Sequence, residues 1–339
     1  MSDAHSDSDS YEIRRERALE FFDRELASFV PERVFDAHLE IWPPGWASKG
    51  ELYCLQREPT DLASLHEEFE VLHPGRLAGA ILIPFSFEAE DLAAANALSG
   101  EIAAQGGPTY RTLLFVRPGD DPEWVRQEGR RLGAVGLKGY YTFADLPDAA
   151  MRAQADIPAY MPEALVRVAH EEGWLINMHL VKTRAVAHPE NRRWIRHYCS
   201  TYPDMKLVLS HAARGFQPAN NLAGLADLTD LPNLYFDSSV NCESFALEAV
   251  IRVAGHARLL YGSDFIASHQ YGRSVAVGDS FIWIHDTSPV WGEGASAVQP
   301  TLVGLEHLRA LKWACWSQGL TDSQVEDIFY GNAAALLGV

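Results

Sequence analysis

The stretch Arg33-Val34-Phe35-Asp36-Ala37-His38 sets the pattern from which the fold is predicted. It is short and largely apolar, as a strand buried on both faces of a parallel sheet should be. His38 and Glu40 stand at its carboxyl end, and residues two apart in a strand share a face, so both are predicted to point the same way. The stretch is therefore predicted to be a buried strand that ends in groups able to bind a metal ion.

Seven further stretches of this kind follow, separated by helical patterns. The remaining predicted strands are Gly79–Pro84, Arg111–Val116, Ala134–Lys138, Trp174–His179, Lys206–His211, Asn233–Asp237 and Arg258–Tyr261. Eight strands alternating with helices favour an α/β fold of the (β/α)8 TIM-barrel type over a doubly wound open sheet, which normally has fewer strands. We predict one barrel domain over residues 11–339, including an N-terminal helix, and a disordered polar tail over residues 1–10.

Two connections are longer than a linker requires: Ile41–Pro59 after the first strand and Phe265–Pro300 after the eighth. Both carry aromatic residues, in which disordered segments are poor, and long ordered loops are usually functional. We expect both loops to form walls or lids over the mouth of the barrel. The clearest predicted helices are Tyr11–Val30, Glu88–Gln105, Pro162–Glu172, Leu302–Trp316 and Thr321–Leu337.

The composition restricts the classes of partner. The chain has 339 residues with 28 basic and 46 acidic side chains, a net charge of −18, which argues against nucleic acid or an anionic membrane as the main partner. No apolar run reaches the about 18 residues of a membrane span, and the first ten residues do not resemble a signal peptide. We expect a cytoplasmic protein with a small-molecule substrate and reduced cysteines, and leave a homo-oligomer open.

Three further strand ends carry groups that can bind a metal ion. His179, His211 and Asp264 follow the fifth, sixth and eighth predicted strands, and closure of a barrel would bring them to His38 and Glu40. Imidazole and carboxylate together are the ligands of catalytic zinc, manganese or iron. Taken alone, each histidine is more often a packed core residue, and Asp264 could cap a helix. Their joint occurrence at four strand ends is what favours one metal site.

The order of these groups resembles that of the amidohydrolase superfamily. Asp36-Ala37-His38-Leu39-Glu40 is similar to its DxHxH opening, and the later histidines and aspartate follow in the same sequence. Gly136–Tyr140, Leu207–His211 and Ile328–Ala333 are similar to the branch that includes 2-amino-3-carboxymuconate-6-semialdehyde decarboxylase, aromatic-acid decarboxylases and dicarboxylate lactonases. The resemblance runs from about Val34 to Leu337 and is specific to the superfamily rather than to a reaction.

The resemblance implies that His38, His179 and Asp264 bind one divalent metal ion and that His211 is the acid or base beside it. Glu40 departs from the pattern, because it stands where the second histidine of the motif is usual. A carboxylate can still bind zinc, manganese or iron, and would favour a harder ion. We predict Glu40 as a ligand and zinc as the ion; the alternative is that Glu40 is a base or ion-pair partner and the metal is weakly held or absent.

Basic side chains near the strand ends are candidates to bind a substrate carboxylate. Some superfamily members carboxylate a lysine on the fourth strand to bridge two metals, but one metal is usual in the branch resembled here, so Lys138 is predicted to anchor the substrate. Arg214 is the second predicted anchor, since arginine binds carboxylates through two hydrogen bonds. The alternatives, each of which could be an ordinary surface charge, are Lys182, Arg184 and Arg117, and the weaker acidic candidates near the seventh strand are Asp237 and Glu243.

These predictions define a function. We expect a metal-dependent hydrolase that breaks a C–O or C–N bond of a small carboxylate-bearing substrate through metal-activated water. Asp264 would take the proton of the water, and His211 would position the substrate and protonate the leaving group. A metal-dependent non-oxidative decarboxylase, a lyase, is the alternative. A non-catalytic barrel with a binding role is the alternative from another class.

Overall fold

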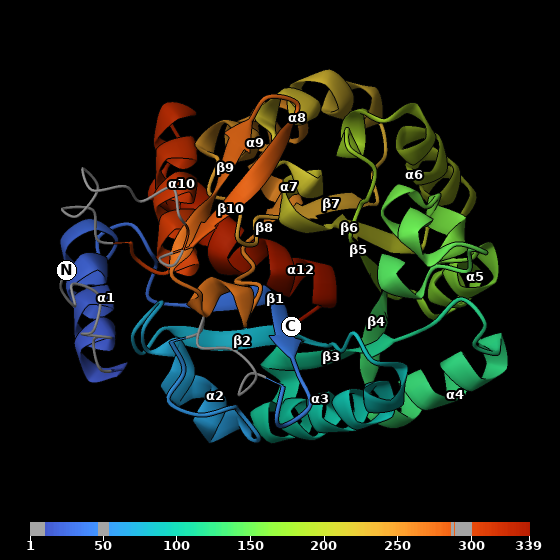
Figure 1. The fold of residues 1–339 in the computed structure, drawn as a ribbon, viewed down its shortest axis with the longest axis horizontal. Helices are drawn as coiled ribbons and strands as arrows, with labels where there is room; N and C mark the ends of the chain where they lie inside the picture. Colours follow the sequence, from blue (N-terminus) through green and yellow to red (C-terminus); the bar gives the residue numbers. More distant parts are fainter. Residues whose placement is uncertain (1–10, 47–53, 286–287, 289–299) are drawn as a thin grey trace, which may run out of the picture.

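The computed structural model describes residues 11–46, 54–285, 288 and 300–339, so the predicted tail and parts of both long connections lie outside the described residues. Eight parallel strands pair in chain order and form the barrel, with helices around it (Figure 1). The strands are β1 (Val34–Ile41), β2 (Leu77–Pro84), β3 (Tyr110–Phe115), β4 (Ala134–Gly139), β5 (Leu175–Met178), β6 (Lys206–Leu209), β7 (Leu234–Asp237) and β8 (Leu259–Leu260). The predicted TIM-barrel fold is confirmed.

Main-chain hydrogen bonds between β1 and the residues that follow β8 close the barrel. The amide of Ala37 donates to the carbonyl of Tyr261 at 2.8 Å, and the amide of Asp264 donates to the carbonyl of His38 at 2.7 Å. Leu39 also pairs in parallel with Phe265, beyond the end of β8. The segment that carries Asp264 is therefore fixed beside the carboxyl end of β1.

The helices follow from local sequence signals. Asp121 caps α4 by accepting hydrogen bonds from the amides of Glu123 and Trp124, and Gly133, at φ +67°, ends it. The helices are α1 (Tyr11–Glu25), α2 (Leu62–Phe69), α3 (Leu92–Gly106), α4 (Pro122–Leu132), α5 (Glu163–Glu172), α6 (Pro189–Thr201), α7 (Ser210–Arg214), α8 (Pro218–Gly224), α9 (Ser244–Ala254), α10 (Val303–Ser317), α11 (Asp322–Glu326) and α12 (Asn332–Leu337). The helix predicted over Thr321–Leu337 is interrupted by a π-helical turn at Asp327–Gly331.

An irregularity in β1 decides which of its side chains face the barrel interior. Asp36 pairs with Ala80 but Leu39 pairs with Leu82, so β1 carries one extra residue between them. Bulges of this kind re-aim side chains and are common next to active sites. Before the bulge Phe35 faces the barrel interior, whereas after it Leu39 belongs to the outer core under the helices, which leaves His38 and Glu40 directed inward.

The interior of the barrel is apolar at one end only. Phe35, Ile81, Leu113, Leu175 and Val208 pack inside it, and Ala333 of α12 packs against them. α12 thus closes the amino-terminal end of the strands. The other end, where the loops after the strands meet, is free for polar groups, as in other TIM barrels.

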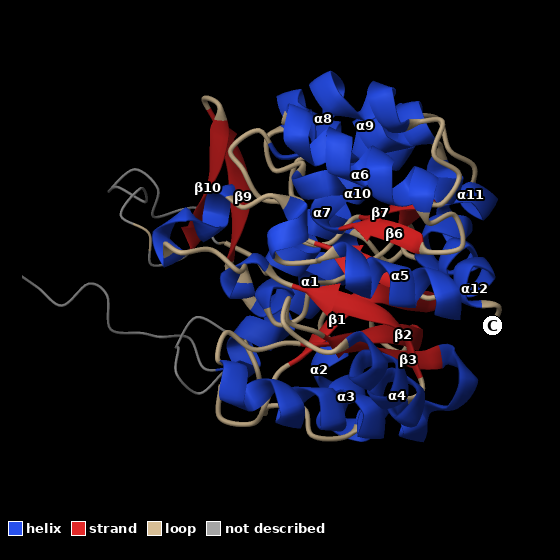
Figure 2. Cartoon of the chain, turned by 90° about the vertical axis from the view of Figure 1, so that its right-hand side faces the viewer, coloured by secondary structure: helices blue, strands red, loops and turns tan. Residues whose placement is uncertain are grey.

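A β-hairpin stands on the carboxyl-terminal side. The predicted loop after the eighth strand contains β9 (Gly272–Val277) and β10 (Ser280–His285), an antiparallel pair that the sequence analysis did not predict. Figure 2 shows the hairpin projecting on the side of the barrel opposite α12. Phe281 and Trp283 pack against Phe216 and a small apolar cluster, so this part of the long connection forms a wall. Within the described residues no helix is both long and apolar enough to cross a membrane.

Candidate metal and active site

His38 lies at the centre of the site. Its Nδ1 is 2.8 Å from Oδ2 of Asp237, a contact that orients the ring and places the other nitrogen toward the barrel mouth. Nε2 is buried and makes no hydrogen bond to any described residue. It lies 3.7 Å from Oε1 of Glu40 and 3.7 Å from Oδ1 of Asp264. The free nitrogen therefore faces two carboxylates.

These three groups fit a divalent metal ion. Donor atoms of His38, Glu40 and Asp264 all lie within 4.8 Å of one another, and all three side chains are buried. Burial, the largest single effect, lowers the pKa of His38, but the charge and hydrogen bond of Asp237 together with the Glu40 carboxylate outweigh it and raise the pKa of His38 to about 10. Burial, followed by the Glu40 carboxylate, raises the pKa of Asp264. The site attracts positive charge, and a proton and a metal ion would compete for the same nitrogen.

His179 and His211 form a second pair beside this group. Nδ1 of His179 is 3.0 Å from Nε2 of His211, and His179 is not among the three residues whose donors cluster. Nδ1 of His211 lies 2.9 Å from the Ser239 hydroxyl and 3.6 Å from Oδ2 of Asp264. Burial lowers the pKa of His211 to about 4 and lowers that of His179 well below its usual value. Both rings are therefore neutral near pH 7.

Asp237 joins the two halves of the site. One oxygen accepts from His38 and, at 3.1 Å, from Nδ2 of Asn177. The other accepts from the amide of His211 at 2.9 Å and from the amide and hydroxyl of Ser239 at 3.2 and 2.5 Å. Burial opposes ionisation of Asp237, yet His38 and these donors lower its pKa. A buried carboxylate with this many donors is a positioning group.

The chain after β6 forms a left-handed helical turn, a conformation that L-residues disfavour. His211, Ala212, Ala213 and Arg214 have φ of 57°, 52°, 60° and 57°. Each such residue costs about 1–2 kcal/mol relative to a right-handed conformation, so four in a row are strongly disfavoured unless other contacts hold them. The turn carries His211 at its start and Arg214 at its end.

The two predicted substrate anchors differ in their surroundings. Lys138 is buried, and its Nζ donates to Oδ1 of Asn177 at 2.6 Å. Burial lowers the pKa of Lys138, while the carboxylates of Glu40, Asp264 and Asp237 oppose that shift. The Lys138 ammonium thus has a bonded partner and compensating charge within the site.

Within the described residues, Arg214 has no carboxylate close enough to compensate its charge. Its Nη1 donates to the carbonyl of Lys182 at 2.9 Å, and the guanidinium lies 5.7 Å from the centre of the Phe281 ring. Among the residues that the structure describes, no carboxylate oxygen is within 4.0 Å of it. Burial lowers the pKa of Arg214, the effect expected of a mostly enclosed cation.

The alternative anchors are less suitable. Lys182 donates to the carbonyl of Gln154 at 2.7 Å and pairs with Asp156 at 3.1 Å. Arg117 is exposed and pairs with Asp120 at 3.2 Å, and Arg184 is exposed. None of the three combines burial with an uncompensated charge.

Aromatic rings surround the His179–His211 pair. The rings of Tyr140 and Tyr141 lie 5.2 and 5.7 Å from the ring of His179. On the other side the Phe216 ring is 5.4 Å from His211 and 4.5 Å from Phe281. These rings form aromatic walls on two sides of the histidine pair.

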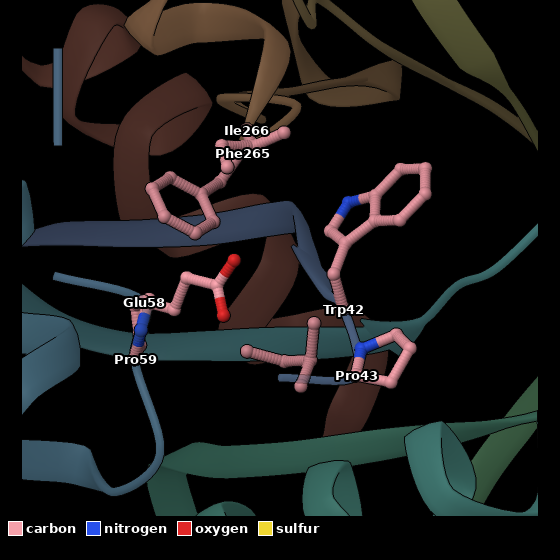
Figure 3. Close-up of a pocket in the computed structure, with 7 residues that line it drawn as sticks. Trp42, Pro43, Glu58, Pro59, Phe265 and Ile266 are labelled. Atoms are coloured by element: carbon pink, nitrogen blue, oxygen red, sulfur yellow. The ribbon is translucent and has the colours of Figure 1, made fainter. Parts of the chain in front are cut away.

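Two hollows are distinct from this site. Figure 3 shows a cavity beside the ends of β1 and β8, where the Glu58 side chain points toward Phe265 with Trp42 opposite; its volume of about 10 Å³ is enough for one water molecule only. A groove of about 900 Å³ lies at the amino-terminal end of the strands, beside Trp313 and Trp316. Neither hollow includes His38, Glu40 or Asp264.

Sequence reasoning ranked two central residues too low or omitted them. Asp237 was a weak candidate, and Asn177, which bonds to Lys138, Ser210 and Asp237, was not a candidate. Both are polar residues near the carboxyl ends of buried apolar strands. That same signal identified His38 and could have been applied to β5 and β7.

The fold and the site together define a class: a TIM-barrel protein whose ionisable groups gather where the strands end. The chain belongs to the amidohydrolase family, whose model matches residues 35–339. That match covers most of the chain and confirms the resemblance inferred from the motifs. No curated protein matched the chain significantly.

Three solved structures illustrate what the fold is similar to. An amidohydrolase from Burkholderia multivorans with bound zinc has 15% identity and a TM-score of 0.53, covering 91% of this chain and 99% of that one. A putative 2-pyrone-4,6-dicarboxylic acid hydrolase from Pseudomonas putida has 17% identity and a TM-score of 0.54, covering 91% and 98%. A 2,6-dihydroxybenzoate decarboxylase complexed with 2,6-dihydroxybenzoate has 14% identity and a TM-score of 0.52, covering 91% and 100%. At these identities the likeness establishes the fold alone, which hydrolases and a decarboxylase share.

Proposed function

We propose that this protein is a metal-dependent hydrolase acting on a C–O or C–N bond of a small carboxylate-bearing substrate. The observation that supports this most strongly is the buried Nε2 of His38, which faces the carboxylates of Glu40 and Asp264 and has no hydrogen-bond partner in the described part of the chain. An imidazole and two carboxylates in reach of one point suit zinc, manganese or iron.

His38, Glu40 and Asp264 would hold the ion, and His179 is retained as a further candidate ligand. When bound, a divalent ion lowers the pKa of a water molecule and polarises a substrate carbonyl. Asp237 would keep the His38 ring oriented toward the ion through the 2.8 Å contact at Nδ1. We propose zinc first, because one imidazole is present, with manganese or iron as alternatives that the two carboxylates would also accept.

Proton transfer is assigned to Asp264 and His211. Asp264, whose pKa burial and Glu40 raise, would accept the proton of the attacking water. His211 lies 3.6 Å from Asp264 and is neutral near pH 7, so it is able to receive that proton and pass it to the leaving group. The contact between His211 and Ser239 would hold the ring during the transfer.

Substrate binding is assigned chiefly to Arg214. Its enclosed guanidinium, which has no carboxylate partner among the described residues, suits a carboxylate of the substrate, which would take two parallel hydrogen bonds. Lys138 stays a weaker proposal, because Asn177 already accepts a hydrogen bond from its ammonium group. The aromatic walls would stack against a planar substrate and exclude bulk water.

Decarboxylation is the second candidate, favoured by the aromatic rings on both sides of the histidine pair. The test is to incubate the zinc- or manganese-loaded protein with 2-pyrone-4,6-dicarboxylate and, separately, with 2,6-dihydroxybenzoate. We expect the pyrone to give a ring-opened product and neither compound to release carbon dioxide. Stoichiometric carbon dioxide would overturn hydrolysis in favour of decarboxylation. Binding of either compound without any product, by a metal-loaded protein, would favour a binding role.

A further inference from the structure

The left-handed turn His211–Arg214 contains no glycine, although glycine is the residue that adopts this conformation without cost. Strained backbone of this kind persists only where surrounding contacts over-determine it, and it concentrates at functional sites. Contacts from other residues must therefore hold the turn, and these residues are distinct from the proposed metal ligands and proton-transfer groups.

Two buried asparagines supply these contacts. Nδ2 of Asn241 donates to the carbonyl of His211 at 3.1 Å, and Nδ2 of Asn221 donates to the carbonyl of Ala212 at 2.9 Å. Both side chains are fully buried. Nδ2 of Asn221 also donates to the carbonyl of Ala246 at 3.2 Å, which ties the turn to α9.

Gly215, the residue after the turn, leaves the space that the Asn221 side chain occupies. A Cβ at Gly215 would lie 2.5 Å from Nδ2 and 2.9 Å from Oδ1 of Asn221. Gly215 also closes the turn, because its amide donates to the carbonyl of His211 at 2.8 Å. A side chain at position 215 would therefore displace the amide group that holds the turn.

The turn brings its first and last side chains to one region. In a helical turn, residues three apart lie on the same side. The His211 ring is 5.4 Å from Phe216, Phe216 is 4.5 Å from Phe281, and the Arg214 guanidinium is 5.7 Å from that same Phe281 ring.

We propose that Asn221 and Asn241 are positioning residues, which hold the left-handed turn so that His211 and Arg214 face the same substrate. This inference rests on the proposed function, in which His211 moves a proton and Arg214 binds a carboxylate. It adds two residues, neither of which touches the substrate, that determine whether those groups act together.

The test compares Asn221→Leu with Asn233→Leu in the zinc-loaded protein. Asn233 is a matched control, because its buried amide likewise donates to main-chain carbonyls, those of Cys199, Tyr202 and Met205, but before β7 at the other end of the barrel. Both variants should lower the melting temperature. The readout is the affinity for phthalate, an aromatic dicarboxylate, measured by calorimetry, together with crystal structures of the variants.

We expect Asn221→Leu to weaken phthalate binding about tenfold or more and Asn233→Leu to leave it within about twofold. Adding Ala213→Gly to Asn221→Leu should restore part of the lost affinity, because glycine accepts positive φ without strain. If Asn221→Leu does not fold, Asn221→Ser, which keeps one donor, takes its place with the same expected direction.

Arg214→Met tests the carboxylate anchor separately from the positioning role of the two asparagines. If phthalate binding depends on Arg214 but is unchanged by Asn221→Leu, the positioning role is overturned while the Arg214 anchor stands. The inference would also fail if the turn kept its positive φ angles in the Asn221→Leu crystal structure. Absence of any Arg214-dependent binding in the wild type would overturn the proposed carboxylate anchor and this inference with it.

Discussion

Replacement of Asp237 by asparagine is the most informative single change, because this carboxylate contacts both halves of the site. Asp237 is fully buried and accepts hydrogen bonds from His38, Asn177, the amide of His211 and Ser239. Asparagine keeps the shape but replaces one acceptor oxygen with an NH₂ donor. That donor must face either the amide of His211 or the ring nitrogen of His38.

The expected magnitude follows from these contacts. Removing one partner of a buried charge pair costs about 3–5 kcal/mol, because the remaining charge is left uncompensated. In the metal-free protein the remaining charge is His38, whose pKa is raised to about 10 against the opposing effect of burial. Because the pKa of His38 is higher in the folded than in the unfolded protein, protonated His38 stabilises the fold fully below about pH 6.5. That stabilisation is lost as the pH rises through about 10. The difference between variant and wild type should therefore shrink over that window.

The assay is denaturant unfolding of the metal-free protein at pH 6, paired with metal affinity measured by competition with a chelator. We expect Asp237→Asn to lose about 3–5 kcal/mol of unfolding free energy and about 10–100-fold in metal affinity. Asp230→Asn is the control. Like Asp237, Asp230 accepts hydrogen bonds at both carboxylate oxygens, in this case from Arg196, but it lies on the surface, so neither quantity should change measurably. A loss below about 1 kcal/mol with unchanged metal affinity would refute the positioning role of Asp237.

Three further predictions follow from the site and the core. Arg214→Lys should raise KM about tenfold with kcat within about threefold, because lysine cannot bind a carboxylate through two parallel bonds; an unchanged KM would contradict the anchor. Glu40→His should raise the ratio of zinc affinity to manganese affinity above that of the wild type in a competition titration, and an unchanged ratio would show that Glu40 is not a ligand. His307 is fully buried, neither of its ring nitrogens has a hydrogen-bond partner among the residues that the structure describes, and burial lowers its pKa to about 3. Between pH 6 and 4 the unfolded chain binds a proton that the native state does not, so His307→Phe should remove about 1.4 kcal/mol per pH unit of acid destabilisation, measured by unfolding at both pH values; an unchanged pH slope would show that His307 is protonated in the folded protein.

The barrel could be predicted because its strands are buried and short. Each apolar stretch ending in a polar group marked a strand end, and the predicted starts and ends differ from the observed strands by a few residues, as between Arg33–His38 and β1. The hairpin β9–β10 was missed although Gly278-Asp279 stands between two runs that read as strands, a sequence typical of a two-residue turn.

The site could be predicted in composition but not in geometry. Alternation correctly placed His38 and Glu40 on one face, but the extra residue in β1 that turns them inward leaves no mark in the sequence. Ser210-His211-Ala212-Ala213-Arg214 reads as an ordinary helix, because handedness depends on the contacts of Asn221 and Asn241, which come from later elements. Tertiary contacts, rather than local propensity, determine both features.

The central claim is that His38, Glu40 and Asp264 hold one divalent metal ion. Its most direct test is a crystal structure of the zinc- or manganese-loaded protein with anomalous diffraction measured at the absorption edge of the metal. We predict a single anomalous peak bonded to Nε2 of His38 and to a carboxylate oxygen of Glu40 and of Asp264. No peak after loading, or a peak bonded to His179 and His211 with Glu40 unbound, would contradict the claim.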